Sequence, residues 1–347
     1  MNKIITHLKD IEKNYKFGIE SYNQEFKSDH WRYINKKKTS LYEIKKLKNF
    51  RNNDLSFGLD DQFYSNKQFE NFFLDLLKEC GEKYVLKFLS KKNIGNVRNF
   101  KIYKKHFVDR HEIFFIKYLK DLERNINLKK VKWVCEIGSG YGGFLSKLLK
   151  FKNFKVVAID LPESHFLTGF FLRKHFPKKK IYYSFQSKNK KIEKKDLSKY
   201  DIFLLYPWDL FPNIKIDLFV NTRSMMEMDY KTINNYFDLI HKKSKIGSYF
   251  YNINRYYKDT TGYPIEFHRY PYDGKWKVIF SRSSWKQNHT HCLLTKRINT
   301  FSDDVKCEMK VIKKKMYKEI KKDSRFIRRS MPDFLYKIYK SIKRLVK

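Results

Sequence analysis

The spacing of apolar residues changes once along this chain, near residue 125. Before that point, apolar positions recur at the spacing of a helix. One stripe is formed by Phe69, Phe72, Phe73, Leu76 and Leu77, and a second begins with Val85, Phe88 and Leu89. This pattern predicts a helical N-terminal region over residues 1–125 with an aromatic-rich core. The stretch 47–61 is rich in Asn, Asp and Gly and is predicted to be a loop within it.

After residue 126, short apolar runs alternate with amphipathic segments. We expect strands over residues 133–137, 156–159, 181–185, 202–205, 218–220 and 249–253, and helices over 144–149, 164–176 and 231–242. Continuous apolar strands separated by helices are typical of a parallel, doubly wound α/β sheet. The prediction is therefore a doubly wound α/β domain over residues 126–300, followed by a basic helical C-terminal extension over 301–347.

The last part of this extension has an amphipathic pattern with many cations. Its apolar face is formed by Phe334, Leu335, Ile338, Ile342 and Leu345, with Lys and Arg between them. Residues 325–347 would suit a helix lying on an anionic membrane surface. A terminal helix docked on the protein, with a solvated basic face, explains the same residues. Both interpretations stay open.

The composition narrows the class of protein without naming its ligand. The chain has 76 Lys and Arg against 37 Asp and Glu, a net charge of +39, together with 41% apolar and 18% aromatic residues. That burial potential excludes a disordered polycation. The charge favours an anionic partner. However, abundant Lys, Asn, Ile, Phe and Tyr are also typical of AT-rich coding sequence.

Cysteine spacing and hydropathy indicate in which cellular compartment the protein works. The four cysteines have no paired spacing, so neither a disulfide framework nor a zinc site is predicted. The chain begins without a secretory signal and contains no run near the roughly 18 apolar residues that a membrane span needs. We expect a cytoplasmic protein, with peripheral contact at the inner face of the membrane through residues 325–347 as an option.

Glycine is scarce in this chain, yet it clusters at one place. Four of the 12 glycines lie at positions 138, 140, 142 and 143, directly after the predicted strand 133–137. A sharp strand-to-helix turn needs glycine, and its free N–H groups can hold the polar end of a ligand. Asp160 ends the next predicted strand, where a carboxylate can accept both hydroxyls of a ribose. The pattern predicts a nucleotide-type cofactor site.

Two cofactors fit this turn. Gly138-x-Gly140-x-x-Gly143 matches the dinucleotide fingerprint. Glu136, two residues earlier, would repel a pyrophosphate but suits the cationic methionine end of S-adenosylmethionine, which we therefore favour. A nicotinamide or flavin nucleotide and a non-binding site are the alternatives. The predicted cofactor residues are Glu136, Gly138, Ser139, Gly140 and Tyr141 for methionine, Asp160 and Leu161 for ribose, Trp208 for adenine, and Asn221 near the methyl group.

Some of these assignments have a purely structural alternative. Trp208 follows the run 202–205 and has about equal claim to be core, because 181–185 competes for the third-strand position. Asn221 ends the fourth predicted strand, where its amide could equally cap the next turn. Both alternatives stay open at the level of the sequence.

A methyltransferase acting on a hydroxyl is helped by a base within hydrogen-bond reach. Glu227 and Asp229 follow the fourth predicted strand and are the first candidates, although either would also complement the dipole of the next helix. His268 is the second candidate. It lies in the aromatic segment 263–272 with Arg269, which resembles a surface for carbohydrate or acidic sugar, or a plain surface loop. No carboxylate spacing argues for a metal.

The segments 133–143, 157–163 and 217–229 resemble the sugar O-methyltransferases of bacterial surface-polysaccharide gene clusters. Ile159-Asp-Leu-Pro-Glu163 together with Asn221-Thr-Arg-Ser-Met-Met-Glu-Met-Asp229 carries most of the likeness. The loop 47–61 and the segment 251–255 are similar to the same family. The resemblance implies a Rossmann-like, seven-stranded class I methyltransferase sheet, S-adenosyl-L-methionine as cofactor, and a nucleotide- or lipid-linked saccharide as acceptor.

Two other functions compete with this hypothesis. A nucleic-acid methyltransferase acting on RNA is suggested by the charge. Enzymes that methylate base amines usually have Asp/Asn-Pro-Pro-aromatic after the fourth strand, whereas this chain has Asn221-Thr-Arg-Ser there. Nucleic acid is therefore the less favoured partner. A non-catalytic scaffold, tethered to the membrane through residues 325–347, is the third hypothesis.

Overall fold

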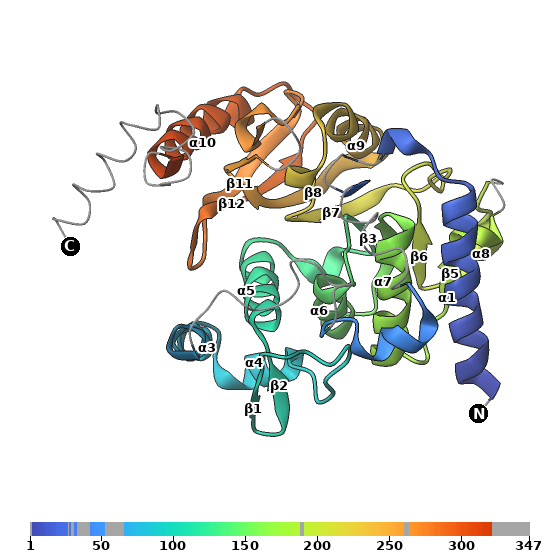
Figure 1. Cartoon of the computed structure of the whole chain (residues 1–347). Helices are drawn as coiled ribbons and strands as arrows, with labels where there is room; N and C mark the ends of the chain where they lie inside the picture. The colour runs from blue at the N-terminus through green and yellow to red at the C-terminus, as the bar shows by residue number, and fades with distance from the viewer. Residues whose placement is uncertain are drawn as a thin grey trace, which may run out of the picture.

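The computed structural model describes residues 2–26, 28, 31–32, 42–52, 66–187, 191–259 and 264–320. Its centre is an eight-stranded sheet in the order β11-β12-β8-β7-β3-β4-β6-β5 (Figure 1). These strands are β3 (Trp133–Ile137), β4 (Lys155–Ile159), β5 (Ile181–Tyr183), β6 (Ile202–Leu205), β7 (Ile216–Thr222), β8 (Ser244–Arg255), β11 (Trp276–Ser284) and β12 (Gln287–Arg297). Two small antiparallel pairs stand apart, β1 (Lys101–Tyr103) with β2 (His106–Val108) and β9 (Tyr257–Lys258) with β10 (Ile265–Glu266).

Helices surround this sheet. The α-helices are α1 (Asn2–Glu20), α3 (Asn66–Cys80), α4 (Glu82–Phe88), α5 (Arg110–Asn125), α6 (Gly143–Phe151), α7 (Pro162–His175), α8 (Lys194–Lys199), α9 (Tyr230–Lys243) and α10 (Asp304–Ile320). Short 3-10 turns are η1 (Gln24–Phe26), η3 (Ile44–Asn49), η5 (Leu128–Lys130), η6 (Ser184–Gln186), η7 (Met225–Glu227) and η8 (Phe267–Arg269).

The predicted α/β fold is confirmed, with two corrections. The sheet has eight strands where seven were expected, and it is mixed, not wholly parallel, because β12 runs antiparallel to both β8 and β11. The hairpin β11-β12 turns over only Trp285 and Lys286, and so short a connection forces antiparallel pairing. The sequence pattern does not reveal these two strands because few of their residues form a continuous apolar run.

Buried side chains lie on both faces of the sheet, which explains why its strands are almost entirely apolar. Along β3, Val134 belongs to one hydrophobic cluster, while Cys135 and Ile137 belong to the other. The first cluster includes side chains of α5, α6 and α7, and the second includes those of α9 and α10. Figure 1 shows these helices on opposite sides of the strands. The predicted stripes of α3 and α4 also enter the first cluster, so their aromatic residues are largely core.

The helical N-terminal region packs against the sheet domain at several places. Helix α1 lies against α7 and η6, while α5 packs on α6. The first hydrophobic cluster runs across residue 125 without interruption, from Leu122 to Ile126 and Val134. The proposed domain boundaries at 125 and 300 remain predictions.

At the C-terminal end, α10 packs on η8 and on the β11-β12 hairpin, and it buries Val305, Ile312 and Met316. The amphipathic segment 325–347 lies outside the described residues, as does residue range 53–61 of the predicted loop. Both interpretations of 325–347 therefore remain predictions. Within the described part of the chain, none of the helices combines the length and the apolar character that crossing a membrane requires.

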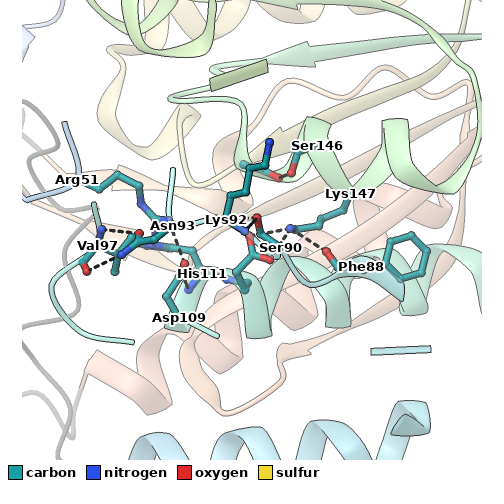
Figure 2. A network of polar contacts seen from close by, with 12 residues as sticks. Arg51, Phe88, Ser90, Lys92, Asn93, Val97, Asp109, His111, Ser146 and Lys147 are labelled. Carbon is teal, nitrogen blue, oxygen red and sulfur yellow. Dashed lines mark hydrogen bonds and ion pairs between the residues drawn. The ribbon is translucent and has the colours of Figure 1, made fainter. Parts of the chain in front are cut away.

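Two buried ion pairs hold the N-terminal region together and attach it to the sheet domain. In the first, Arg51 Nη1 donates to Asp109 Oδ2 at 2.9 Å, and the two side chains are only 4% and 6% exposed (Figure 2). Asp109 also caps α5 by accepting from the N–H groups of His111 and Glu112. Burial opposes ionisation of Asp109, but Arg51 more than offsets it and the pKa falls to about 2. The chain after η3 is thereby tied to the start of α5.

The second pair joins three helices. Lys147 of α6 is fully buried and donates to both carboxylate oxygens of Glu112 in α5, at 2.6 and 2.5 Å. Its third contact is with the carbonyl oxygen of Phe88, at the end of α4, at 3.1 Å (Figure 2). A buried ammonium is tolerated only when its charge is paired and its N–H groups are satisfied, and both conditions are met here.

We predict that Arg51→Met lowers the free energy of unfolding by about 3–5 kcal/mol, because it leaves the Asp109 carboxylate buried without its counter-ion. Urea denaturation measures the change. Lys16→Met serves as the control, since it breaks an exposed 2.9 Å pair with Glu12 and should change the stability by less than about 1 kcal/mol. Equal effects of the two substitutions would contradict an anchoring role for Arg51.

Candidate active site

The predicted glycine cluster forms the turn from β3 into α6, as expected. Gly138 has φ 72° and Gly140 has φ 56°, both in the left-handed region that favours glycine. A Cβ atom on Gly138 would stand 1.8 Å from Oγ of Ser224, whereas one on Gly140 would meet nothing within 4 Å. The turn is thus closed against the end of β7 at Gly138 and open at Gly140.

Glu136, at the end of β3, has an unusual environment for a carboxylate. It is 1% exposed, and its Oε1 accepts a hydrogen bond from Thr222 Oγ1 at 3.1 Å. Its Oε2 is buried and has no hydrogen-bond partner among the described residues. Burial raises the pKa of Glu136 well above its usual range, and nearby Asp160 raises it further. A cationic or hydrogen-bond-donating ligand would satisfy this oxygen.

Asp160 follows β4 and connects the end of β4 to the turn after β3. Its Oδ2 accepts from the N–H of Gly140 at 2.7 Å, and its Oδ1 accepts from the N–H of Leu161 at 2.8 Å. Burial raises the pKa of Asp160 to about 7, although these N–H groups and the Ser164 hydroxyl act in the opposite direction. A carboxylate offers about four lone pairs, so Asp160 can still accept from a ligand hydroxyl.

Ser139 and Tyr141 lie in the same turn, but their side chains have different surroundings. Ser139 is 7% exposed, and its Oγ has no hydrogen-bond partner among the described residues. The ring of Tyr141 is buried between the guanidinium of Arg51, at 4.8 Å, and the edge of Phe171, also at 4.8 Å. Tyr141 is therefore a packing residue in the structure, and its contact with a cofactor stays a prediction.

The position predicted for adenine lies beyond β6. Because β6 pairs directly with β4 while β5 lies at the sheet edge, Trp208 follows the strand next to β4. Its ring lies 5.2 Å from Tyr206, 4.9 Å from Tyr22 and 6.3 Å from Phe26. Trp208 is thus part of an aromatic cluster whose two outer members come from the segment that follows α1. Stacking on a base and core packing both remain open for it.

Tyr22 is a residue of this site that the sequence pattern does not single out. Its phenol lies close enough to the carboxylates of Glu163 and Asp160 for both to raise its pKa, in addition to the larger effect of burial. Nothing in the local sequence marks Tyr22, because these acidic neighbours and Trp208 belong to distant parts of the chain.

Asn221 forms a hydrogen-bonded link between three strands. Its Nδ2 donates to the carbonyl of Ile137 at 2.7 Å, and its Oδ1 accepts from Asn254 Nδ2 at 2.8 Å and from the N–H of Met225 at 3.2 Å. The amide therefore caps the turn after β7, as the structural alternative expected. Its place near the methyl group stays a prediction. Asn254, fully buried on β8, is a second residue that the sequence did not single out.

The three candidate bases lie in different places. Glu227, on η7 just after β7, pairs with Lys258 of β9. Asp229 caps α9 by accepting from the N–H of Thr232 at 2.6 Å. His268 lies on η8, which packs against α10; its imidazole is 3.8 Å from Glu266, and burial lowers its pKa. In the described segments, no hydrogen bond or ion pair joins the His268 imidazole to the glycine turn.

The described part of the chain offers no cluster of metal ligands. Nowhere in it do three His, Cys, Asp or Glu side chains lie together as a bound metal ion would require.

No protein-family model and no curated protein sequence matches this chain. Similar solved structures include the mitomycin 7-O-methyltransferase MmcR, with 10% identity over 54% of this chain and 57% of that one and a TM-score of 0.36. The glycopeptide N-methyltransferase MtfA, complexed with S-adenosyl-L-methionine, has 11% identity over 57% of this chain and 100% of its own, with a TM-score of 0.35. An S-adenosylmethionine-dependent methyltransferase from Clostridium acetobutylicum has 12% identity over 55% of this chain and 93% of its own, with a TM-score of 0.37.

The first two neighbours are an O-methyltransferase and an N-methyltransferase. The chain spans little more than half of MmcR. At such identities and TM-scores the likeness carries no argument about ligand or reaction. The interpretation of the site therefore depends on the geometry described above.

Asp160 gives a pH prediction. The folded protein keeps the proton on Asp160 up to about pH 7, whereas the unfolded chain loses it near pH 4. The unfolded state then binds fewer protons, so this group makes the free energy of unfolding fall between about pH 4 and pH 7. Asp160→Asn should remove that part of the fall. Urea denaturation across this range tests it, with surface Asp303→Asn as control. A slope equal to the wild type would contradict the assignment.

Asp229 allows the capping and base roles to be separated. We predict that Asp229→Ala lowers the stability by about 1 kcal/mol, because the cap of α9 is lost, and that Asp229→Asn keeps it, since Asn caps equally well. Thermal unfolding measures both. A base would behave differently, because Asn cannot take a proton. If Asp229→Asn were stable but abolished methyl transfer, the residue would be assigned to catalysis as well.

Proposed function

We propose that this chain is an S-adenosylmethionine-dependent O-methyltransferase that transfers a methyl group to a saccharide hydroxyl in surface-glycan biosynthesis. The observation that carries the cofactor assignment is the buried, unpartnered oxygen of Glu136 among the described residues. It lies at the end of β3, beside a turn that is open at Gly140 and bonded to Asp160.

The chemistry of these residues fits a cationic nucleoside. The carboxylate of Glu136 would accept from, or pair with, the cationic methionine end, and Asp160 would accept from the ribose hydroxyls. A pyrophosphate at the same place would meet like charge, which costs about 4 kcal/mol per pair at 4 Å and an effective dielectric constant of about 20. The dinucleotide alternative is therefore disfavoured. Trp208 is our proposed contact for adenine.

S-adenosylmethionine supplies a methyl group on a sulfonium that is already a good leaving group. The protein's own task is to hold the acceptor oxygen in line and to take its proton. Glu227 and Asp229 are the first candidates for the base, since both follow β7, whose Thr222 bonds Glu136. His268 is the second candidate.

The saccharide assignment is supported by the sequence resemblance. In the aromatic segment after β9, Arg269 stacks over Tyr230 at 4.5 Å and lies 3.9 Å from Glu266. We propose a nucleotide- or lipid-linked sugar as acceptor, and a protein that works in the cytoplasm with peripheral membrane contact through residues 325–347.

Isothermal titration with S-adenosylmethionine tests the cofactor. The wild type should bind it, Asp160→Ala should abolish binding, and Glu136→Gln should weaken binding at least tenfold, or about 1.4 kcal/mol. Glu193→Gln, which changes an exposed carboxylate, is the matched control. Unimpaired binding by Asp160→Ala would remove the ribose contact. Binding of a nicotinamide nucleotide in place of S-adenosylmethionine would overturn the proposal.

The acceptor needs a separate measurement. Methyl transfer from labelled S-adenosylmethionine should be found with nucleotide-linked sugars and not with RNA. Transfer to RNA, with an affinity that falls steeply as salt increases, would favour the nucleic-acid methyltransferase instead.

A further inference from the structure

Arg223 has a strained backbone at the rim of the candidate active site. It follows β7 with φ 61°, a left-handed conformation that is unfavourable for a residue with a side chain. Its N–H donates to the carbonyl of Ile253 at 2.6 Å, which holds the turn in place. Such conformations persist where the surrounding structure imposes them, and they concentrate at functional sites.

The neighbours of Arg223 place it beside the proposed cofactor. Thr222, directly before it, donates to Glu136, and Ser224, directly after it, packs against Gly138. The backbone of Arg223 therefore lies where the turn after β3 meets the end of β7. If the cofactor binds in this turn as proposed, Arg223 lies on the side of it that β7 forms.

The guanidinium of Arg223 has no counter-ion among the described residues. The residue is partly buried, and no hydrogen bond or ion pair engages its side chain within the part of the chain that the structure describes. Acidic side chains in this region are already used by other cations: Glu227 by Lys258, and Asp109 by Arg51.

Further cations lie within electrostatic range of Arg223. Burial lowers the pKa of His111 on α5 to about 3; Arg51 lowers it further, Asp109 acts against this, and Arg110 and Arg223 add smaller effects in the same direction as Arg51. Burial also lowers the pKa of Lys258 on β9, against the pull of Glu227 and with the help of Arg255 and Arg223. Arg223 thus lies within electrostatic range of α5 and β9, where Arg51 and Lys258 are already paired with Asp109 and Glu227.

A partly buried arginine without a counter-ion among the described residues suits a carboxylate or a phosphate, to which its guanidinium can give two parallel N–H···O bonds. We propose that Arg223 binds an anionic group on the acceptor sugar, a carboxylate or a phosphate, and so selects acidic or phosphorylated saccharides. This inference rests on the proposed function. It divides the rim by charge, with Glu136 facing the cationic cofactor and Arg223 facing the anionic acceptor.

Ligand-observed NMR on the full chain, saturated with S-adenosylhomocysteine, tests this proposal. The probes are D-glucuronate, D-glucose 1-phosphate and neutral D-glucose. We expect at least one anionic sugar to bind the wild type tenfold or more tightly than glucose, and the one that does identifies carboxylate or phosphate. Arg223→Gln should reduce the preference below about twofold. Arg124→Gln, which removes an exposed guanidinium far along the chain on α5, should keep the preference for the anionic sugar.

Two further variants guard against misfolding and misassignment. Arg223→Gly removes the side chain and suits the positive φ, so it should unfold at a temperature no lower than the wild type and still lose the preference. Arg223→Lys should keep more of a preference for phosphate than for carboxylate, because a point charge does not form the paired bonds. Equal binding of the three sugars by the wild type, or a preference retained in Arg223→Gln, would overturn the proposal.

S-adenosylmethionine itself carries a carboxylate, and its affinity is therefore measured for every variant. Unchanged affinity in Arg223→Gln supports a contact with the acceptor. A tenfold loss would assign the guanidinium to the cofactor and overturn the inference. The sugar titrations are repeated without cofactor, so that a chain unable to bind S-adenosylmethionine, which would refute the proposed function, would still report on Arg223.

Discussion

The parallel pairing of β3 with β4 on one side and with β7 on the other is the constraint on which the site depends. From β3 the chain moves to β4 and β6 on one side and later returns to β7 on the other, so the connections at the carboxyl ends of β3 and β7 diverge, which is where open α/β sheets bind their ligands. Glu136, Asp160 and Asn221 come from β3, β4 and β7 or directly follow them. The bond from Asn221 to the carbonyl of Ile137 holds the ends of β7 and β3 together.

Charge, as well as apolar packing, determines where the N-terminal region sits. Buried ion pairs stabilise a fold only modestly compared with apolar residues, but breaking one is costly, so they define a single arrangement. Arg51 pairs with Asp109 and also lies over the ring of Tyr141 in the glycine turn. The same guanidinium thus connects the N-terminal chain, the start of α5 and the glycine turn, which explains how a region before the sheet can shape the candidate site within it.

The net charge of +39 says less about function than two individual side chains do. Most of the cations in the described segments lie at the surface or are paired with carbonyls and acids. Glu136 and Arg223 differ from them because each is at least partly shielded from water and lacks a complete partner among the described residues. They belong to adjacent strands or directly follow them, and one is a carboxyl group while the other is a guanidinium. The electrostatics of the site are therefore set by local burial and not by composition.

Local patterns in the amino-acid sequence determined much of this protein by themselves. The strands 133–137 and 202–205 match β3 and β6 to the residue, and the glycine turn lies where the scarcity of glycine indicated, because periodicity and positive φ are properties of neighbouring residues. Only the tertiary structure decided that β6 lies between β4 and β5, that β11 and β12 form a hairpin, that Asp229 is a cap, and that Arg223 has no counter-ion among the described residues. Each of these depends on contacts between residues distant in sequence, or on which partner a polar group finds, and a linear pattern does not encode that choice.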